Sequence, residues 1–137
     1  MSRHVLVAAY RGGRHRDHGG TRPRELEALL ASVAKQDVPA ARVVLVGNAT
    51  SLDDVSTDVL DAAGTPRRHR RDQGAAHREP RVPGGRNVGL EFLRDASEVD
   101  VVVELDDDGL LVATDVFREV RRHFEQNPRL GIIGFRV

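Results

Sequence analysis

Residues 100–109 have the sequence DVVVELDDDG, and this stretch decides the fold class of the chain. Three consecutive valines at 101–103 indicate a strand that is covered on both faces of a sheet, as in parallel sheets flanked by helices. An acidic triplet at 106–108 follows directly. We therefore expect a buried strand over residues 100–105 with carboxylates at its carboxyl end.

The chain before this strand alternates between strand and helix patterns. Short apolar runs at residues 5–9 and 42–46 predict two further strands. Between Pro23 and Pro39, apolar residues recur at spacings of three and four, which predicts an amphipathic helix. Its apolar positions are Leu26, Leu29, Leu30 and Val33.

A second helix is expected over residues 51–62. Ser51 and Asp54 are suited to cap its start, and Gly64 is suited to close it. The next stretch, residues 66–83, is rich in arginine and has almost no large apolar residue. We expect a mobile, solvated basic loop there, which is favoured over a site for phosphates or for an anionic partner.

Two helices and one strand complete the predicted elements. One helix begins at Gly85, and the other begins at a cap formed by Thr114 or Asp115 and ends at Asn127. One face of each helix is apolar and is expected in the core: Val88, Phe92 and Leu93 in the first helix, and Val116, Phe117, Val120 and Phe124 in the second. Residues 131–137 predict a final apolar strand.

Alternating strands and helices predict an α/β fold, with a mainly parallel sheet flanked by helices, in a single domain over residues 1–137. Acidic and basic residues balance at 21 each, which argues against nucleic acid as a partner. The chain has no Cys, so disulfides and thiolate metal sites are excluded. With no signal-peptide pattern and no apolar run long enough to span a bilayer, we expect a cytoplasmic protein, or a peripheral one at the inner membrane face.

The chemistry is expected at the carboxyl ends of the strands, where ligands gather in open α/β sheets. If the backbone stays extended after residue 105, Asp106 and Asp108 project to the same side. Two close carboxylates repel each other unless a cation lies between them, and a hard divalent ion such as Mg²⁺ or Mn²⁺ suits them. The alternative is a solvated acidic turn, which is less favoured directly after a buried strand.

The order of these motifs resembles the N-terminal, donor-binding part of the family-2 glycosyltransferases of GT-A fold, over nearly the whole chain. An apolar strand ends near a tyrosine, here Tyr10, and a second strand leads into a turn, here residues 45–51. The family's Arg-Asn-x-Gly element at a helix start is matched at 86–89, and its Asp-x-Asp element after a strand is matched at 106–108. The chain departs from the family at Gly47, where an Asp usually bonds the base.

The resemblance implies inverting transfer of a sugar from a nucleoside-diphosphate sugar to an acceptor, such as a polysaccharide, a lipid or a natural product. The residues implied in binding the donor are Tyr10, Gly47, Asn48, Gly85, Arg86, Asn87 and Asp106. Asp106 and Asp108 are implied as ligands of Mg²⁺ or Mn²⁺, which neutralises the departing diphosphate. The family carries its general base and acceptor site in a second half, so we expect a GT-A sheet that is incomplete at the C-terminus, and we assign no catalytic residue.

Three alternatives stay open. A non-catalytic module would bind nucleotide, or would associate with another chain through the strand at 131–137. A haloacid-dehalogenase-type phosphatase has a similar acidic element, but it needs a Thr where Leu110 stands and is less favoured. A zinc site at His15, Asp17 and His18 lacks a third ligand at convincing spacing, so a solvated loop is favoured there.

Overall fold

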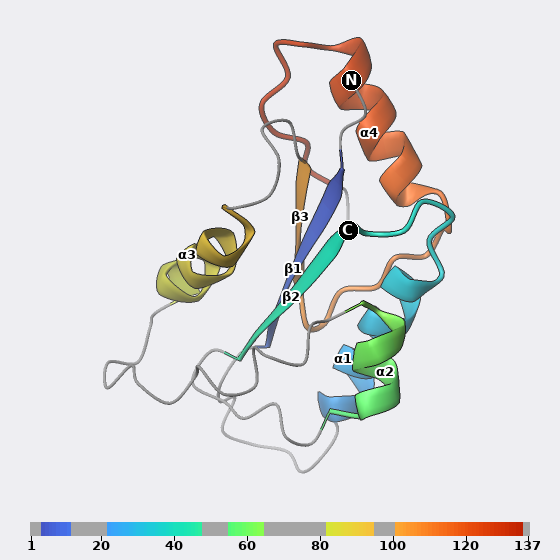
Figure 1. The fold of residues 1–137 in the computed structure, drawn as a ribbon, viewed down its shortest axis with the longest axis vertical. Helices are drawn as coiled ribbons and strands as arrows, with labels where there is room; N and C mark the ends of the chain where they lie inside the picture. Colours follow the sequence, from blue (N-terminus) through green and yellow to red (C-terminus); the bar gives the residue numbers. More distant parts are fainter. Residues whose placement is uncertain (1–3, 12–21, 48–54, 65–81, 95–100, 136–137) are drawn as a thin grey trace.

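The computed structural model describes residues 4–11, 22–47, 55–64, 82–94 and 101–135. Its elements in chain order are β1 (Val5–Arg11), α1 (Arg22–Ala34), β2 (Arg42–Gly47), α2 (Thr57–Ala62), α3 (Val82–Leu93), β3 (Val101–Asp106) and α4 (Val116–Gln126). The strands form one parallel sheet in the order β2-β1-β3 (Figure 1). The predicted α/β fold, with a parallel sheet flanked by helices, is therefore confirmed.

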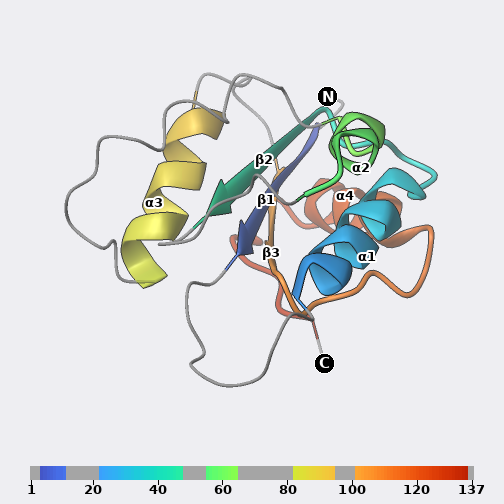
Figure 2. The same cartoon turned by 90° about the horizontal axis from the view of Figure 1, so that it is seen from below.

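The alternation of side chains along each strand separates two faces of the sheet. Figure 2 shows α3 on one face, and α1, α2 and α4 on the other. The core beneath α1 and α4 contains Val5, Val7, Val33, Val43, Val101, Val103, Phe117 and Val120. On the opposite face Leu6, Val44 and Val46 pack with Leu93 of α3. Odd-numbered strand positions thus face α1, α2 and α4, and even-numbered positions face α3.

The apolar stripe predicted for the first helix is confirmed in α1. Leu26, Leu29 and Leu30 are fully buried, and they pack with Leu45 of β2 and with Val55. Burying a leucine side chain completely stabilises a fold by roughly 1.5–3 kcal/mol. The stripe therefore anchors α1 on the sheet more firmly than its helix propensity could.

The second helix is shorter than predicted. α2 covers Thr57–Ala62, and its N-cap residue, Ser56, makes no side-chain capping hydrogen bond. The predicted capping pair, Ser51 and Asp54, lies outside the described residues. The helix closes as predicted at Gly64, whose φ of 73° lies in the left-handed region that favours glycine.

The third helix starts earlier than predicted. α3 begins at Val82 and not at Gly85, so Val82 and Pro83 are helical and do not belong to the loop expected over 66–83. Proline is tolerated in the first turn of a helix because the N–H that it lacks would have no helical partner there. The remainder of the expected loop, residues 66–81, lies outside the described part of the chain.

The buried face of α3 is displaced by one position from the prediction. Leu93 is buried, but Val88 and Phe92, expected beside it in the core, are 41% and 37% exposed. Gly89, one turn before Leu93, is buried as well. The helix therefore meets the sheet through positions 89 and 93. The helical period alone fits the neighbouring face at 88 and 92 equally well, so the choice between the two faces depends on how the helix packs on the sheet.

The valines of β3 are covered less evenly than expected. Val101 and Val103 are each 4% exposed beneath the helices of the odd face, whereas Val102 on the α3 face is half-buried. The expectation of full cover is thus correct for one face only. The reason is that Leu93 of α3 packs over β1 and β2, which leaves β3 at the margin of this helix.

The last helix has its predicted apolar face, but the last strand does not form. Phe117 and Val120 are buried in α4, and Val116 and Phe124 pack against the same cluster. Residues 131–135 contain no strand. Apolar composition favours a strand, but a strand also needs a hydrogen-bonded neighbour, which composition does not supply.

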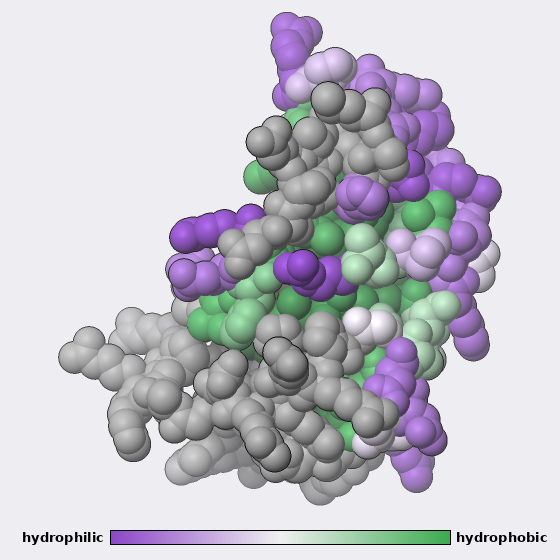
Figure 3. All heavy atoms as spheres, in the orientation of Figure 1, coloured by the Kyte–Doolittle hydropathy of each residue, from purple (hydrophilic) through white to green (hydrophobic). Residues whose placement is uncertain are grey.

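Apolar side chains reach the surface near this C-terminal segment. Ile132 is 87% exposed and Phe135 is 54% exposed. Figure 3 shows apolar surface across the middle of one face of the molecule, with the hydrophilic residues of α4 beside it. Exposed apolar residues are common on protein surfaces and do not by themselves indicate a function.

Candidate functional site

The sheet brings three of the predicted site residues together at its carboxyl edge. Tyr10 of β1 is paired in register with Val46 on one side and with Asp106 on the other. Gly47 is the partner of Arg11, the next residue of β1. Tyr10 is thus the immediate backbone neighbour of Asp106, whereas Gly47 lies on the other side of β1, at the end of β2. Asn48 and the side chain of Tyr10 lie outside the described part of the structure.

Helix α3 brings three more predicted residues to the same edge. Arg42, the first residue of β2, donates a hydrogen bond of 3.3 Å from Nη1 to the carbonyl oxygen of Phe92, so α3 ends at the amino edge of the sheet. Its first turns, with Gly85, Arg86 and Asn87, therefore lie towards the carboxyl edge. Asn87 is exposed and Arg86 is half-buried.

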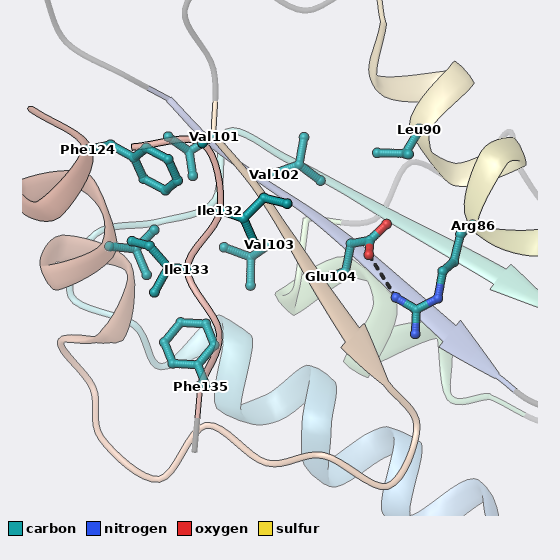
Figure 4. Close-up of a pocket in the computed structure, with 12 residues that line it drawn as sticks. Arg86, Leu90, Val101, Val102, Val103, Glu104, Phe124, Ile132, Ile133 and Phe135 are labelled. Atoms are coloured by element: carbon teal, nitrogen blue, oxygen red, sulfur yellow. Dashed lines mark hydrogen bonds and ion pairs between the residues drawn. The ribbon is translucent and has the colours of Figure 1, made fainter. Parts of the chain in front are cut away.

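Arg86 joins α3 to the end of β3 through two carboxylates. Its Nη1 lies 2.7 Å from Oε2 of Glu104, and its Nη2 lies 3.2 Å from Oδ1 of Asp106. Figure 4 shows the guanidinium turned towards Glu104. Glu104 and Asp106 are both even-numbered positions of β3 and so share the face that α3 covers. The planar guanidinium has several N–H donors and can reach both acids at once.

This ion-pair cluster is only partly shielded from water. The side chains of Arg86 and Glu104 are 35% and 34% exposed, and that of Asp106 is 62% exposed. Ion pairs this close to solvent contribute at most about 1 kcal/mol each to stability. The cluster is therefore better suited to orienting charge at the edge of the sheet than to holding the fold together.

Asp108 does not take the position that the sequence pattern suggested. The extended backbone of β3 ends at Asp106, and Asp107 and Asp108 lie in a turn that the N–H of Gly109 closes on the carbonyl oxygen of Asp106 at 3.0 Å. Alternation of side chains holds only in an extended chain, so the condition under which Asp106 and Asp108 were expected to project to one side is not met. The acids that share a strand face are Glu104 and Asp106, and the cation between them is the Arg86 guanidinium.

Gly109 allows this turn to be tight. A Cβ atom at this position would lie 3.2 Å from the carbonyl oxygen of Asp106, which is closer than nine in ten real contacts of this type. Any other residue after Asp108 would therefore require the turn to shift by a few tenths of an ångström.

The loop after the acidic turn is tied to the end of α1. Oγ of Ser32 accepts a hydrogen bond of 3.2 Å from the N–H of Leu111, and the N–H of Asp37 donates one of 2.8 Å to the carbonyl oxygen of Thr114. Ser32 is 8% exposed, so its contact with the loop is sheltered from water. These bonds hold the segment between the acidic turn and α4 against the core.

Gln36 is the residue in this connection that the sequence pattern did not reveal. Its Nε2 donates a hydrogen bond of 2.7 Å to the carbonyl oxygen of Ala113, and its Oε1 accepts a hydrogen bond of 3.3 Å from the N–H of Phe117. Asp115 occupies the N-cap position of α4 as predicted, but its side chain makes no capping bond. Gln36 caps the helix from 81 positions away along the chain, so no local pattern could have shown it.

Asp106 and Asp108 suit a hard divalent cation by their ligand type. Among the described residues, no three His, Cys, Asp or Glu side chains gather closely enough to hold a metal ion by themselves. Mg²⁺ is commonly bound through one or two carboxylates, and its remaining positions are filled by phosphate oxygens and water. The acids of this edge fit a cation that arrives together with a phosphate ligand. His15, Asp17 and His18 lie outside the described residues.

A pocket of about 480 Å³ adjoins the ion-pair cluster (Figure 4). Its wall is apolar along β3 and along the C-terminal segment, and Arg86 and Glu104 line it as well. The residues on the apolar wall include Val102, Ile132 and Phe135. Arg86 and Glu104 thus form the polar part of a pocket wall that is otherwise mainly apolar.

In the described part of the chain, no helix combines the length and the apolar character that crossing a membrane requires. No protein-family model matches the chain, and no curated protein or solved structure is significantly similar to it.

Proposed function

We propose that the chain binds a nucleoside-diphosphate sugar at the carboxyl edge of its sheet and belongs to a glycosyltransferase of GT-A type, which transfers the sugar with inversion to an acceptor. The observation that carries this proposal is the convergence of Arg86 from α3 with Asp106 at the end of β3, beside the backbone of Tyr10. The acceptor class, whether a polysaccharide, a lipid or a natural product, is left open.

The arrangement suits a diphosphate because it offers a positive group and acidic metal ligands at one edge. The Arg86 guanidinium has the fork of donors that binds phosphate oxygens. Tyr10 and Gly47, at the ends of neighbouring strands, border the position proposed for the base and ribose. Gly85 and Asn87 flank Arg86 in α3 and would complete the phosphate side.

Asp106 and Asp108 are the residues proposed to hold Mg²⁺ or Mn²⁺. When bound, this cation neutralises charge that develops on the leaving diphosphate. Asp106 lies on the face that α3 covers and Asp108 lies in the following turn, and both are exposed. The family resemblance makes Asp108 the more direct ligand of the two. We assign no general base to the described residues.

Calorimetric titration with uridine and thymidine diphosphates, with and without Mn²⁺, tests the binding step. We expect binding that depends on Mn²⁺ and that is weakened at least about tenfold in Asp106→Asn and in Asp108→Ala, since each loses a charged contact. Asp58→Asn, an exposed acid in the first turn of α2, is the matched control and should bind like the unaltered chain. Equal binding by Asp106→Asn and the unaltered chain would refute the site.

Transfer is tested separately, by release of nucleoside diphosphate from sugar donors. Release that requires Mn²⁺ and is lost in Asp106→Asn supports an enzyme. Metal-dependent binding without release supports the alternative, a non-catalytic nucleotide-binding module.

A further inference from the structure

We propose that Arg86 is an exchangeable counter-ion of Asp106. When the diphosphate binds, the divalent cation replaces Arg86 as the partner of Asp106. Glu104 is the positioning residue that keeps the guanidinium of Arg86 at the site during this exchange. This inference rests on the proposed function and assigns a role to Glu104, an acid to which the sequence motifs gave none.

The guanidinium occupies the position on Asp106 that a metal ion would need. Nη2 of Arg86 lies 3.2 Å from Oδ1 of Asp106 and 3.5 Å from Oδ2, so it faces both oxygens of the carboxylate. A cation coordinated to the same oxygens at about 2.1 Å would compete for their lone pairs and would repel the guanidinium. Arg86 and the metal ion are therefore alternative partners of Asp106.

The contacts of Arg86 with Glu104 and with Asp106 differ in strength, and this difference gives the exchange a direction. The contact with Glu104 is 2.7 Å long and the contact with Asp106 is 3.2 Å long. The Glu104 side chain is 34% exposed, against 62% for Asp106. A shorter and drier ion pair is the harder one to break. Arg86 consequently leaves Asp106 first and stays attached to Glu104.

The charge balance explains why the diphosphate binds together with the cation. Among the described side chains, Glu104, Asp106, Asp107 and Asp108 carry four negative charges at this edge, and Arg86 opposes them with one positive charge. These side chains by themselves repel a diphosphate that arrives without a cation. When a divalent ion neutralises Asp106 and Asp108, Arg86 gives up its contact with Asp106 and turns the Nη2 donors of that contact to the phosphate oxygens.

The test compares Mn²⁺ binding to the nucleotide-free protein with diphosphate binding in the presence of Mn²⁺. Free Mn²⁺ is measured by electron paramagnetic resonance, and binding of uridine and thymidine diphosphates is measured by calorimetry. We expect Arg86→Ala to raise the affinity for Mn²⁺ alone up to about fivefold, the upper range for a partly exposed ion pair. The same variant should lower the Mn²⁺-dependent affinity for diphosphate. A purely structural role for Arg86 would lower both affinities.

A double-mutant cycle tests the role of Glu104. Glu104→Gln should weaken diphosphate binding, but it should add nothing in an Arg86→Ala background, because Glu104 acts through Arg86. Glu104→Asp, which retains the charge, should recover part of the loss. Arg94→Ala, directly after the end of α3, is the matched control, since Arg94 is 78% exposed and pairs with Glu91 only at 4.0 Å. Circular dichroism confirms that each variant is folded.

The possible results separate this inference from the function on which it rests. If the unaltered chain binds diphosphate with Mn²⁺ but Arg86→Ala leaves the affinity for Mn²⁺ alone unchanged or lower, the exchange is refuted and the proposed function stands. Additive effects of Glu104→Gln and Arg86→Ala refute the positioning role. If the unaltered chain binds neither Mn²⁺ nor diphosphate, both proposals are refuted.

Discussion

Replacing Gln36 by alanine should destabilise the protein far more than its place at the end of a helix suggests. The side chain is 7% exposed and connects α1 to the start of α4. Gln36→Ala leaves the carbonyl oxygen of Ala113 and the N–H of Phe117 without these partners. A lost hydrogen bond to a sheltered group costs about 1 kcal/mol or somewhat more, so we expect a total loss of roughly 2–3 kcal/mol. For a chain of this size, that corresponds to a fall in Tm of roughly 6–12 °C.

Urea unfolding followed by circular dichroism measures this loss, and hydrogen exchange at the Phe117 amide locates it. Gln126→Ala is the control, because the Gln126 side chain bonds only at the surface, to Arg122 at 3.3 Å. Gln36→Glu keeps an oxygen that can accept from Phe117 but loses the donor to Ala113, so its effect should be intermediate. A loss below about 0.5 kcal/mol in Gln36→Ala, with exchange at Phe117 unchanged, would refute the bridging role.

Three further predictions concern the fold. Phe117→Ala should cost about 3–5 kcal/mol in urea unfolding, because the ring is fully buried; a cost below about 1 kcal/mol would contradict its place in the core. Gly64→Ala should cost about 1 kcal/mol, and the cost should come from backbone strain at a φ of 73° because the added Cβ meets no atom within 4 Å. Gly64→Asn should cost less, because asparagine tolerates this conformation better, and equal losses would contradict this explanation. Arg122 lowers the pKa of Glu119 in the folded state, chiefly through its hydrogen bond to the carboxylate. The pair therefore stabilises the fold at pH values above the ordinary pKa of a glutamate, and this stabilisation is lost as the pH falls through the lowered pKa of the folded state. Glu119→Gln should therefore flatten the acid limb of a plot of Tm against pH, and an unchanged limb would contradict the assignment.

Much of the architecture could be predicted from local patterns. The spacing of Leu26, Leu29 and Leu30 identified the buried stripe of α1, because a helix places such residues on one side whatever it packs against. Gly64 was recognised as a helix end because its left-handed conformation is costly for other residues. The proximity of Arg86 to Asp106 was also predictable, since helix starts and strand ends meet at one edge of a parallel sheet.

The details of the site could not be predicted in the same way. Alternation along β3 holds only while the backbone is extended, and the turn that Gly109 closes removes Asp108 from that pattern. The same alternation places Glu104 beside Asp106, but the sequence does not show that Arg86 bridges them. That contact depends on how α3 is rotated over the sheet, and its buried face differs by one position from the predicted one.

The sequence by itself determined the order of the elements from β1 to α4, most residues of the core and the presence of acids at a strand end, because these depend on propensity and on periods of two and 3.6 residues. Only the tertiary structure decided which acid pairs with Arg86, that Gln36 caps α4, and that residues 131–135 form no strand. Each of these outcomes depends on groups distant in the chain being brought within hydrogen-bonding distance, and local sequence contains no record of such contacts.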